Sequence, residues 1–240
     1  MNSETKHINS AFDQDLDRLL TLLMAMGGQV ENAISKSIQA LQMSDLELAE
    51  QVIADDQRID ALQEEIHTAA VNCIAIRQPQ ASDLRMVIAV MRISDSLERS
   101  GDHAKNTAKR MPIITQHPHR QDKVASLCRF AKTTQTLLKN ALDAFIQTDE
   151  GKARQVIAQD FDIDQMHGSL FREFVTYMLE DPTIVTPILH LLFVAKNVER
   201  IGDHATGIAE QCVYLITGRI PDDERQRHED YAYLRDSIAG

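Results

Sequence analysis

The chain repeats itself once, and a repeat limits the choice of fold more than any other feature of this sequence. The block ERSGDHA at 98–104 returns as ERIGDHA at 199–205, with six identities in seven positions at an offset of 101 residues. Upstream, the tripeptide VIA occurs at 52–54 and again at 156–158, at an offset of 104 residues. We therefore predict two copies of one structural unit.

The first copy has the hydrophobic spacing of α-helices. Along 48–73 and 86–108, apolar or small residues recur every three, four or seven positions, which places them on one side of a helix. Pro79 and Pro182 stand where a helix is expected to end. Each copy is therefore predicted to consist of three helices.

The expected fold is all-α, a tandem repeat of two three-helix bundles. Hydrophobic residues make up 43% of the chain but aromatic residues only 5%, which favours long aliphatic helix faces over a β-sandwich. We predict a first three-helix unit at 1–111, a linker at 112–121, a second unit at 122–218 and a charged tail at 219–240. Helices of about 30 residues would each span about 45 Å.

Capping residues indicate where two of the helices begin. Ser44 followed by Glu47 has the spacing of a capping box. Thr148, followed by Asp149 and Glu150, marks the equivalent position in the second copy. We therefore predict that Ser44 and Thr148 are the N-terminal caps.

Two glycines stand inside the helical pattern, one in each copy. Gly101 and Gly202 each cost a helix roughly 0.5 to 1 kcal/mol relative to alanine. We interpret both as sites of close helix packing rather than as hinges.

Charge and composition exclude several functions. A net charge of -11 opposes binding to nucleic acid or to an anionic membrane. The apolar runs are too short to span a bilayer, and the first residues lack the apolar segment of a secretory signal. Cys73, Cys128 and Cys212 are widely spaced and are interpreted as reduced core residues. We expect a cytoplasmic protein that does not insert into the membrane.

Four pairs of carboxylates have the same i, i+4 spacing. On a helix each pair shares one face, with Cβ atoms about 5 to 6 Å apart, and like charges at that spacing are destabilising. The pairs are Asp56 with Asp60, Glu98 with Asp102, Asp160 with Asp164, and Glu199 with Asp203. A positive group is therefore expected between them.

An antiparallel hairpin at the proline turn would bring two of these pairs to one level in each copy. Asp56 and Asp102 are equally far along the chain from Pro79, and so are Asp60 and Glu98. The second copy has the same arrangement about its own proline turn. The sequence thus predicts two clusters of four carboxylates.

Oxygen ligands from facing helices suit hard cations such as magnesium, calcium, manganese or iron. The predicted metal ligands are Asp56, Asp60, Glu98, Asp102, Asp160, Asp164, Glu199 and Asp203. Alternatively, the acidic faces are solvated surface on which Arg99 and Arg200 pair with the carboxylates. Lys196, which replaces Asp95 in the second copy, would neutralise that cluster without a metal.

The histidines are weaker candidates. His103 and His204 adjoin the key aspartates but lie about 100° around the helix from them, so we regard them only as groups that could support the site. His190 is interpreted as a core or boundary residue, and HPHR at 117–120 as linker. The sequence has no Gly-rich phosphate loop, nucleophile elbow or Cys–His pairing. We predict a protein that is not an enzyme.

The doubled Glu-Arg-x-Gly-Asp motif resembles the PhoU family of phosphate-uptake regulators. ERSGDHA and ERIGDHA, IRQPQASDLR before the first of them and MAMGGQVENAI near the start carry the resemblance, which extends from about Phe12 to Gly218. It implies a tandem three-helix-bundle protein, often a homodimer, whose acidic motifs bind metal clusters, with iron or zinc among the metals.

The resemblance also implies a function. Members of the family are cytoplasmic accessory proteins that repress phosphate-starvation genes when phosphate is plentiful. Their implied partners are the ATPase subunit of the phosphate ABC transporter and the sensor histidine kinase of the phosphate system. Asn106 becomes Gly207 in the second copy, which predicts a poorer second metal site. The alternative function is a helical-bundle carboxylate metalloenzyme, and the metal, iron, zinc, manganese or magnesium, stays open.

Overall fold

The structure, a computed structural model, describes the backbone of residues 2–116 and 121–219 and the side chains of 11–116 and 124–219. The predicted all-α fold is confirmed for this part of the chain. The helices are α1 (Asn2–Met43), α2 (Leu46–Arg77), α3 (Ser82–Ala108), α4 (Met111–Ile114), α5 (Gln121–Gln147), α6 (Glu150–Glu180), the 3-10 helix η2 (Pro182–Ile184) and α7 (Val185–Thr217).

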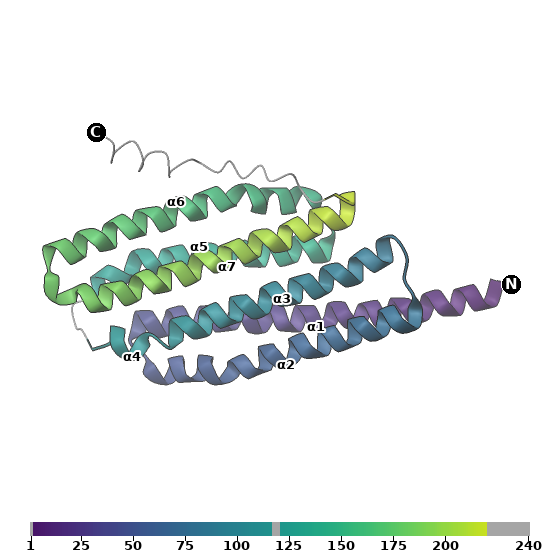
Figure 1. Ribbon diagram of the computed structural model, residues 1–240, viewed down its shortest axis with the longest axis horizontal. Coiled ribbons are helices and arrows are strands. Elements are labelled where there is room, and N and C mark those ends of the chain that lie inside the picture. The colour runs from purple at the N-terminus through teal and green to yellow at the C-terminus, as the bar shows by residue number, and fades with distance from the viewer. Residues whose placement is uncertain (1, 117–120, 220–240) are drawn as a thin grey trace.

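The six long helices form two bundles that lie side by side (Figure 1). Helices α1, α2 and α3 pack together, and α5, α6 and α7 form the second bundle. The bundles meet where α3 packs on α7 and α1 packs on α5, whereas α2 and α6 lie on the outer sides. One continuous core of Leu, Ile, Val, Ala and Phe side chains fills both bundles.

Contacts between equivalent residues reveal an approximate two-fold axis between the repeats. His103 and His204, equivalent at the 101-residue offset, stack with ring centroids 5.7 Å apart. Gln135 donates a hydrogen bond of 3.1 Å from Nε2 to the backbone oxygen of Glu31, its equivalent at the 104-residue offset. Because a residue can touch its own counterpart only near the symmetry axis, this axis passes through both helix contacts.

The predicted capping residues were wrong by one position in both repeats. Asp45 and Asp149 are the N-terminal caps of α2 and α6, and their carboxylates accept backbone N–H bonds of 2.9 Å and 3.0 Å. Ser44 and Thr148 instead have φ angles of 62° and 52° and form the turn before the helix. A carboxylate makes the stronger, charge-assisted cap, which explains why the helix begins one residue later.

The proline turns lie where the sequence places them. Pro79 stands between α2 and α3, and Pro182 begins η2 between α6 and α7. The short helix α4 crosses the predicted boundary between the first unit and the linker. The HPHR segment at 117–120 and the residues 220–240 of the predicted tail lie outside the described residues. Each repeat therefore contains the antiparallel hairpin on which the carboxylate prediction depends.

Both mid-helix glycines are sites of close packing, as predicted. A Cβ atom at Gly101 would lie 2.9 Å from Cδ1 of Ile59, and one at Gly202 would lie 2.9 Å from Cγ2 of Ile163. The glycines thus let α3 approach α2 and α7 approach α6. This approach brings the carboxylates of the two helices within reach of each other.

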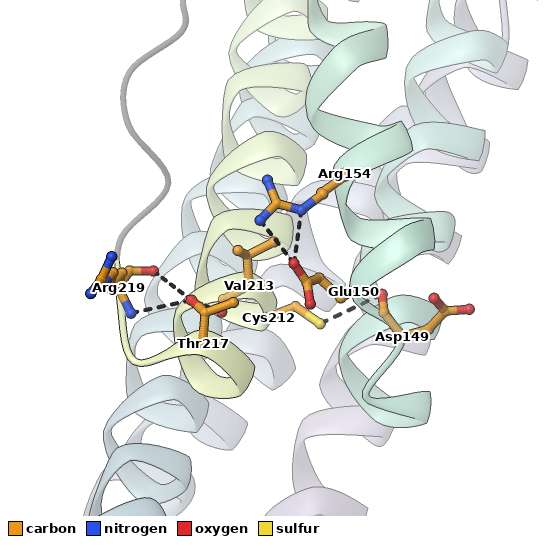
Figure 2. A network of polar contacts seen from close by, with 7 residues as sticks. All are labelled: Asp149, Glu150, Arg154, Cys212, Val213, Thr217 and Arg219. Carbon is orange, nitrogen blue, oxygen red and sulfur yellow. Dashed lines mark hydrogen bonds and ion pairs between the residues drawn. The ribbon is translucent and has the colours of Figure 1, made fainter.

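The end of α7 is joined to the start of α6 by a polar network (Figure 2). The Cys212 thiol lies 3.4 Å from the backbone oxygen of Ala144 and 4.0 Å from that of Asp149. Arg154 pairs with Glu150 at 2.8 Å in the first turns of α6. Burial raises the pKa of the Cys212 thiol to about 11, so this cysteine is protonated at neutral pH and acts as a core residue.

The other two cysteines agree with the predicted reduced state. Cys73 is buried and Cys128 half-buried, and both are free thiols. Among the described residues, none of the helices combines the length and the hydrophobicity needed to cross a bilayer.

Candidate functional site

Helices α2 and α3 form the first carboxylate cluster, which consists of Asp56, Asp60, Glu98 and Asp102. The Nζ atom of Lys105 donates hydrogen bonds to Asp56 and, at 2.7 Å, to Asp102. The Asp56 side chain is only 6% exposed. The positive group expected between the carboxylates is therefore Lys105, whereas Arg99 is exposed and makes no ion pair in the described part of the chain.

The remaining acids of the first cluster, Asp60 and Glu98, are affected by the charges of their neighbours. Burial, followed by the charge of Asp56, raises the pKa of Asp60. Burial, followed by the charges of Asp102 and Asp60, raises the pKa of Glu98. The charges of Asp56 and Asp102 thus act on Asp60 and Glu98, in agreement with the shared level that equal distances from Pro79 predict.

Helices α6 and α7 form the second cluster, which consists of Asp160, Asp164, Glu199 and Asp203. Lys196 pairs with Glu199 at 2.6 Å, as one sequence alternative predicts. The hydroxyl of Thr206 donates a 2.9 Å hydrogen bond to Oδ1 of Asp160. Arg200 is exposed and forms no ion pair with these acids among the described side chains.

Two acids of the second cluster lack a cationic partner. No ammonium or guanidinium group in the described ranges lies within ion-pair distance of Asp164 or Asp203. Burial, followed by the charges of Glu199 and Asp160, raises the pKa of Asp203 to about 6. Burial, followed by the charge of Asp160, also raises the pKa of Asp164. The second cluster is therefore incompletely neutralised at pH 7.

Replacing Asp203 by asparagine is expected to stabilise the protein at pH 7.5. The carboxylate is charged in both the folded and the unfolded states at that pH, and only the folded state bears the cost of burial and repulsion. After its partial solvent exposure is allowed for, the gain is about 1 to 2 kcal/mol in the free energy of unfolding. Urea titrations at several pH values measure it.

The pH dependence of this gain in stability tests the raised pKa of Asp203. As the pH falls through about 6, Asp203 becomes protonated in the folded state, whereas in the unfolded state it stays charged until the pH nears its ordinary pKa of 3.8. The stability gained by Asp203→Asn should therefore shrink over this range and vanish at its lower end. His204 titrates in both proteins, and its contribution cancels in the difference. A stability difference that is constant from pH 7.5 to pH 4 would contradict the raised pKa.

Neither cluster is arranged as a preformed metal site in the described part of the chain. In the described ranges, no three His, Cys, Asp or Glu side chains converge on a point where one ion could be coordinated. The first cluster is moreover closed by the Lys105 ammonium. Metal binding by the eight carboxylates stays a prediction.

The histidines do not support the carboxylates. His103 and His204 stack on each other between the two bundles, and burial, followed by the charge of His103, lowers the pKa of His204 to about 4. His190 is half-buried beside the edge of Phe193, 3.4 Å from the guanidinium of Arg110, in agreement with its interpretation as a boundary residue. All three contribute to packing between the repeats.

Sequence reasoning missed Lys105 and Thr206, which are equivalent at the 101-residue offset. Each binds the aspartate of the neighbouring helix. The signal was present, because both lie one turn of helix after the second acid of the repeated motif. A test of each repeat for cations at that spacing would have found the lysine.

Comparison with known proteins decides the family. The family model described as "PhoU domain" matches residues 23–111 and 127–212, one match in each repeat. The chain belongs to the PhoU family. PhoU homologs from Rhizobium meliloti and Zymomonas mobilis are 44% and 43% identical, over 93% and 95% of this chain and 94% and 95% of their own length.

Solved PhoU structures have the same fold. The crystal structure of PhoU from Pseudomonas aeruginosa has a TM-score of 0.83 and 35% identity, and covers 87% of this chain and 100% of its own. The regulatory protein PhoU from Streptococcus pneumoniae has a TM-score of 0.81 and 31% identity, with coverages of 88% and 99%. The predicted tandem PhoU fold is thus confirmed.

The family assignment also decides between an enzyme and a regulator. The relatives from Rhizobium meliloti and Zymomonas mobilis are named as accessory proteins of the phosphate-specific transport system. PhoU proteins are non-catalytic regulators, so the prediction that this chain is not an enzyme is confirmed at the level of the family. The metalloenzyme alternative has no support from these relatives.

Proposed function

We propose that this PhoU protein is a cytoplasmic adaptor that represses phosphate-starvation signalling when phosphate is plentiful. In this proposal it links the ATPase subunit of the phosphate ABC transporter to the sensor histidine kinase. The observation that carries the proposal is the match of both repeats, over nearly the whole chain, to proteins named for phosphate-specific transport.

Deletion of the gene is expected to derepress phosphate-starvation genes in phosphate-rich medium. An alkaline phosphatase reporter in the source organism measures the effect, and a plasmid copy of the wild-type gene should restore repression. Reporter activity that is the same with and without the gene would refute a regulatory function.

The link itself needs a separate measurement, because a regulator could act without joining two proteins. Purified PhoU protein, immobilised on a sensor surface, should bind the cytoplasmic part of the kinase and the purified ATPase subunit, each alone and both together. Binding of one partner that excludes the other would contradict the linking mechanism while leaving regulation intact. Analytical ultracentrifugation tests the proposed homodimer in the same preparation.

We propose that any metal ion of this protein is bound at the second cluster, whose side chains would rearrange around it. This reverses the prediction of a poorer second site, which depended on Gly207 alone. Asp164 and Asp203 support this assignment, because no cation pairs with them in the described structure and their pKa values are raised. Elemental analysis for iron, zinc, manganese and magnesium tests it on untagged protein, beside a variant with Asp164 and Asp203 changed to asparagine. Equal metal content in the two proteins would contradict it.

A further inference from the structure

We propose that Lys105 is the permanent cation of the first carboxylate cluster, and that this cluster therefore does not hold the metal ion that the family resemblance implies. The two repeats would then differ in cation binding although their acidic motifs are alike. This inference concerns ion binding and folding only, and it does not depend on the regulatory function proposed above.

The geometry around Lys105 is that of a filled cation site. Its ammonium group lies between the two helices of the hairpin and donates to Asp56 on α2 and to Asp102 on α3. The Lys105 side chain is 22% exposed and that of Asp56 is 6% exposed. A metal ion that used these carboxylate oxygens would have to displace the ammonium, because two cations cannot occupy one small site.

Displacement by a metal ion is disfavoured for two reasons. Lys105 stands three residues after Asp102 on the same helix, so its ammonium group is always near the site, whereas a metal ion must be captured from solution and lose bound water. Displacement would also leave the Lys105 ammonium, whose side chain is 22% exposed, without its two acidic partners. The resident lysine therefore competes with any ion at this cluster.

The second repeat shows what the site is like without this lysine. Thr206 takes the equivalent position and gives Asp160 a neutral hydrogen bond. The lysine of the second cluster, Lys196, is 47% exposed and binds Glu199 from the same helix. Its charge is thus taken up by Glu199, and Asp160, Asp164 and Asp203 have no lysine or arginine partner among the described side chains.

The test uses Lys105→Thr, which copies the second repeat, with Lys109→Thr on the exposed end of α3 as the matched control. Lys105→Thr is expected to lower the thermal midpoint by about 5 to 10 °C, because Asp56 loses its partner. It should also create a Mn²⁺ site, measured by isothermal titration calorimetry, and saturating Mn²⁺ should restore most of the midpoint. Lys109→Thr should change neither the thermal midpoint nor the binding of Mn²⁺.

A second variant keeps the proposal testable if Lys105→Thr does not fold. Asp102→Asn in the presence of the native Lys105 should leave the number of bound Mn²⁺ ions per chain unchanged, because the first cluster binds none. Adding Asp102→Asn to Lys105→Thr should remove the new site. Mn²⁺ bound by the wild type and lost in Asp102→Asn would overturn the proposal, as would a folded Lys105→Thr variant that gains no site.

Discussion

Replacing Phe130 by alanine is expected to lower the free energy of unfolding by about 3 to 5 kcal/mol. Phe130 lies on α5, has no solvent exposure and is among the largest fully buried side chains. Its ring packs near that of His167 on α6, with centroids 6.3 Å apart. Truncation would remove these contacts and leave a cavity in the second bundle, because helices joined by short turns cannot close around it. Urea denaturation measures the loss.

Phe171→Ala is the control for this prediction. Phe171 stands on α6 of the same bundle but is 51% exposed, so its truncation should change the stability by no more than about 0.5 kcal/mol. If both variants lost the same amount of stability, the burial described for α5 would be wrong.

Replacing Gly202 by valine is expected to cost about 3 kcal/mol, at the upper end of the range for overpacked cores. The Cβ position lies 2.9 Å from Cγ2 of Ile163, a branched methyl group close to the backbone of α6. That methyl cannot rotate away without moving the side chain, so α7 must shift away from α6. Thermal unfolding and urea titration both measure the loss.

Gly207 provides the matched control, one and a half turns further along α7. A Cβ atom there meets nothing within 4 Å, so Gly207→Ala should gain roughly 0.5 to 1 kcal/mol from helix propensity alone. The change in stability caused by Gly101→Ala should lie between those of the variants at Gly202 and Gly207, because the added Cβ meets the flexible Cδ1 end of Ile59. Equal stability of the variants at Gly202 and Gly207 would show that α6 and α7 are not in close contact.

The two carboxylate clusters have the same acidic motif but different surroundings. Both hairpins bring four acids together, and both acidic motifs are preserved between the repeats. One difference lies outside the acidic pattern, where the first repeat has Lys105 and the second has Thr206. A half-buried ammonium repels a second cation, whereas a neutral hydroxyl does not.

The hairpin and its acid clusters could be predicted because they depend on local rules. The helical period and the two prolines determine which residues meet, and equal distances along the chain from a turn bring Asp56 opposite Asp102. The caps were placed one residue early because serine, threonine and aspartate are all good caps. Choosing Asp45 and Asp149 depends on the turn geometry at Ser44 and Thr148, which have positive φ angles.

The contacts between the bundles could not be predicted from the sequence. His103 and His204 were expected near the acids because they adjoin them in sequence, yet each ring turns towards its counterpart across the approximate two-fold axis. Helical periodicity reveals that a face is apolar but not which other face covers it. Only the packing of α3 on α7 decided that these histidines would be half-buried against each other, with the pKa of each lowered by burial.

Sequence alone was sufficient for the all-α fold, the two repeats, the helix pairs joined at Pro79 and Pro182, and the family. These follow from periodicity, from backbone restriction by proline and from motifs of contiguous residues. The tertiary structure decided which charge lies beside which acid, because a lysine side chain can reach in several directions and burial selects among them. It placed Lys105 between the helices of the first repeat and left Asp203 of the second without a cationic partner among the described residues.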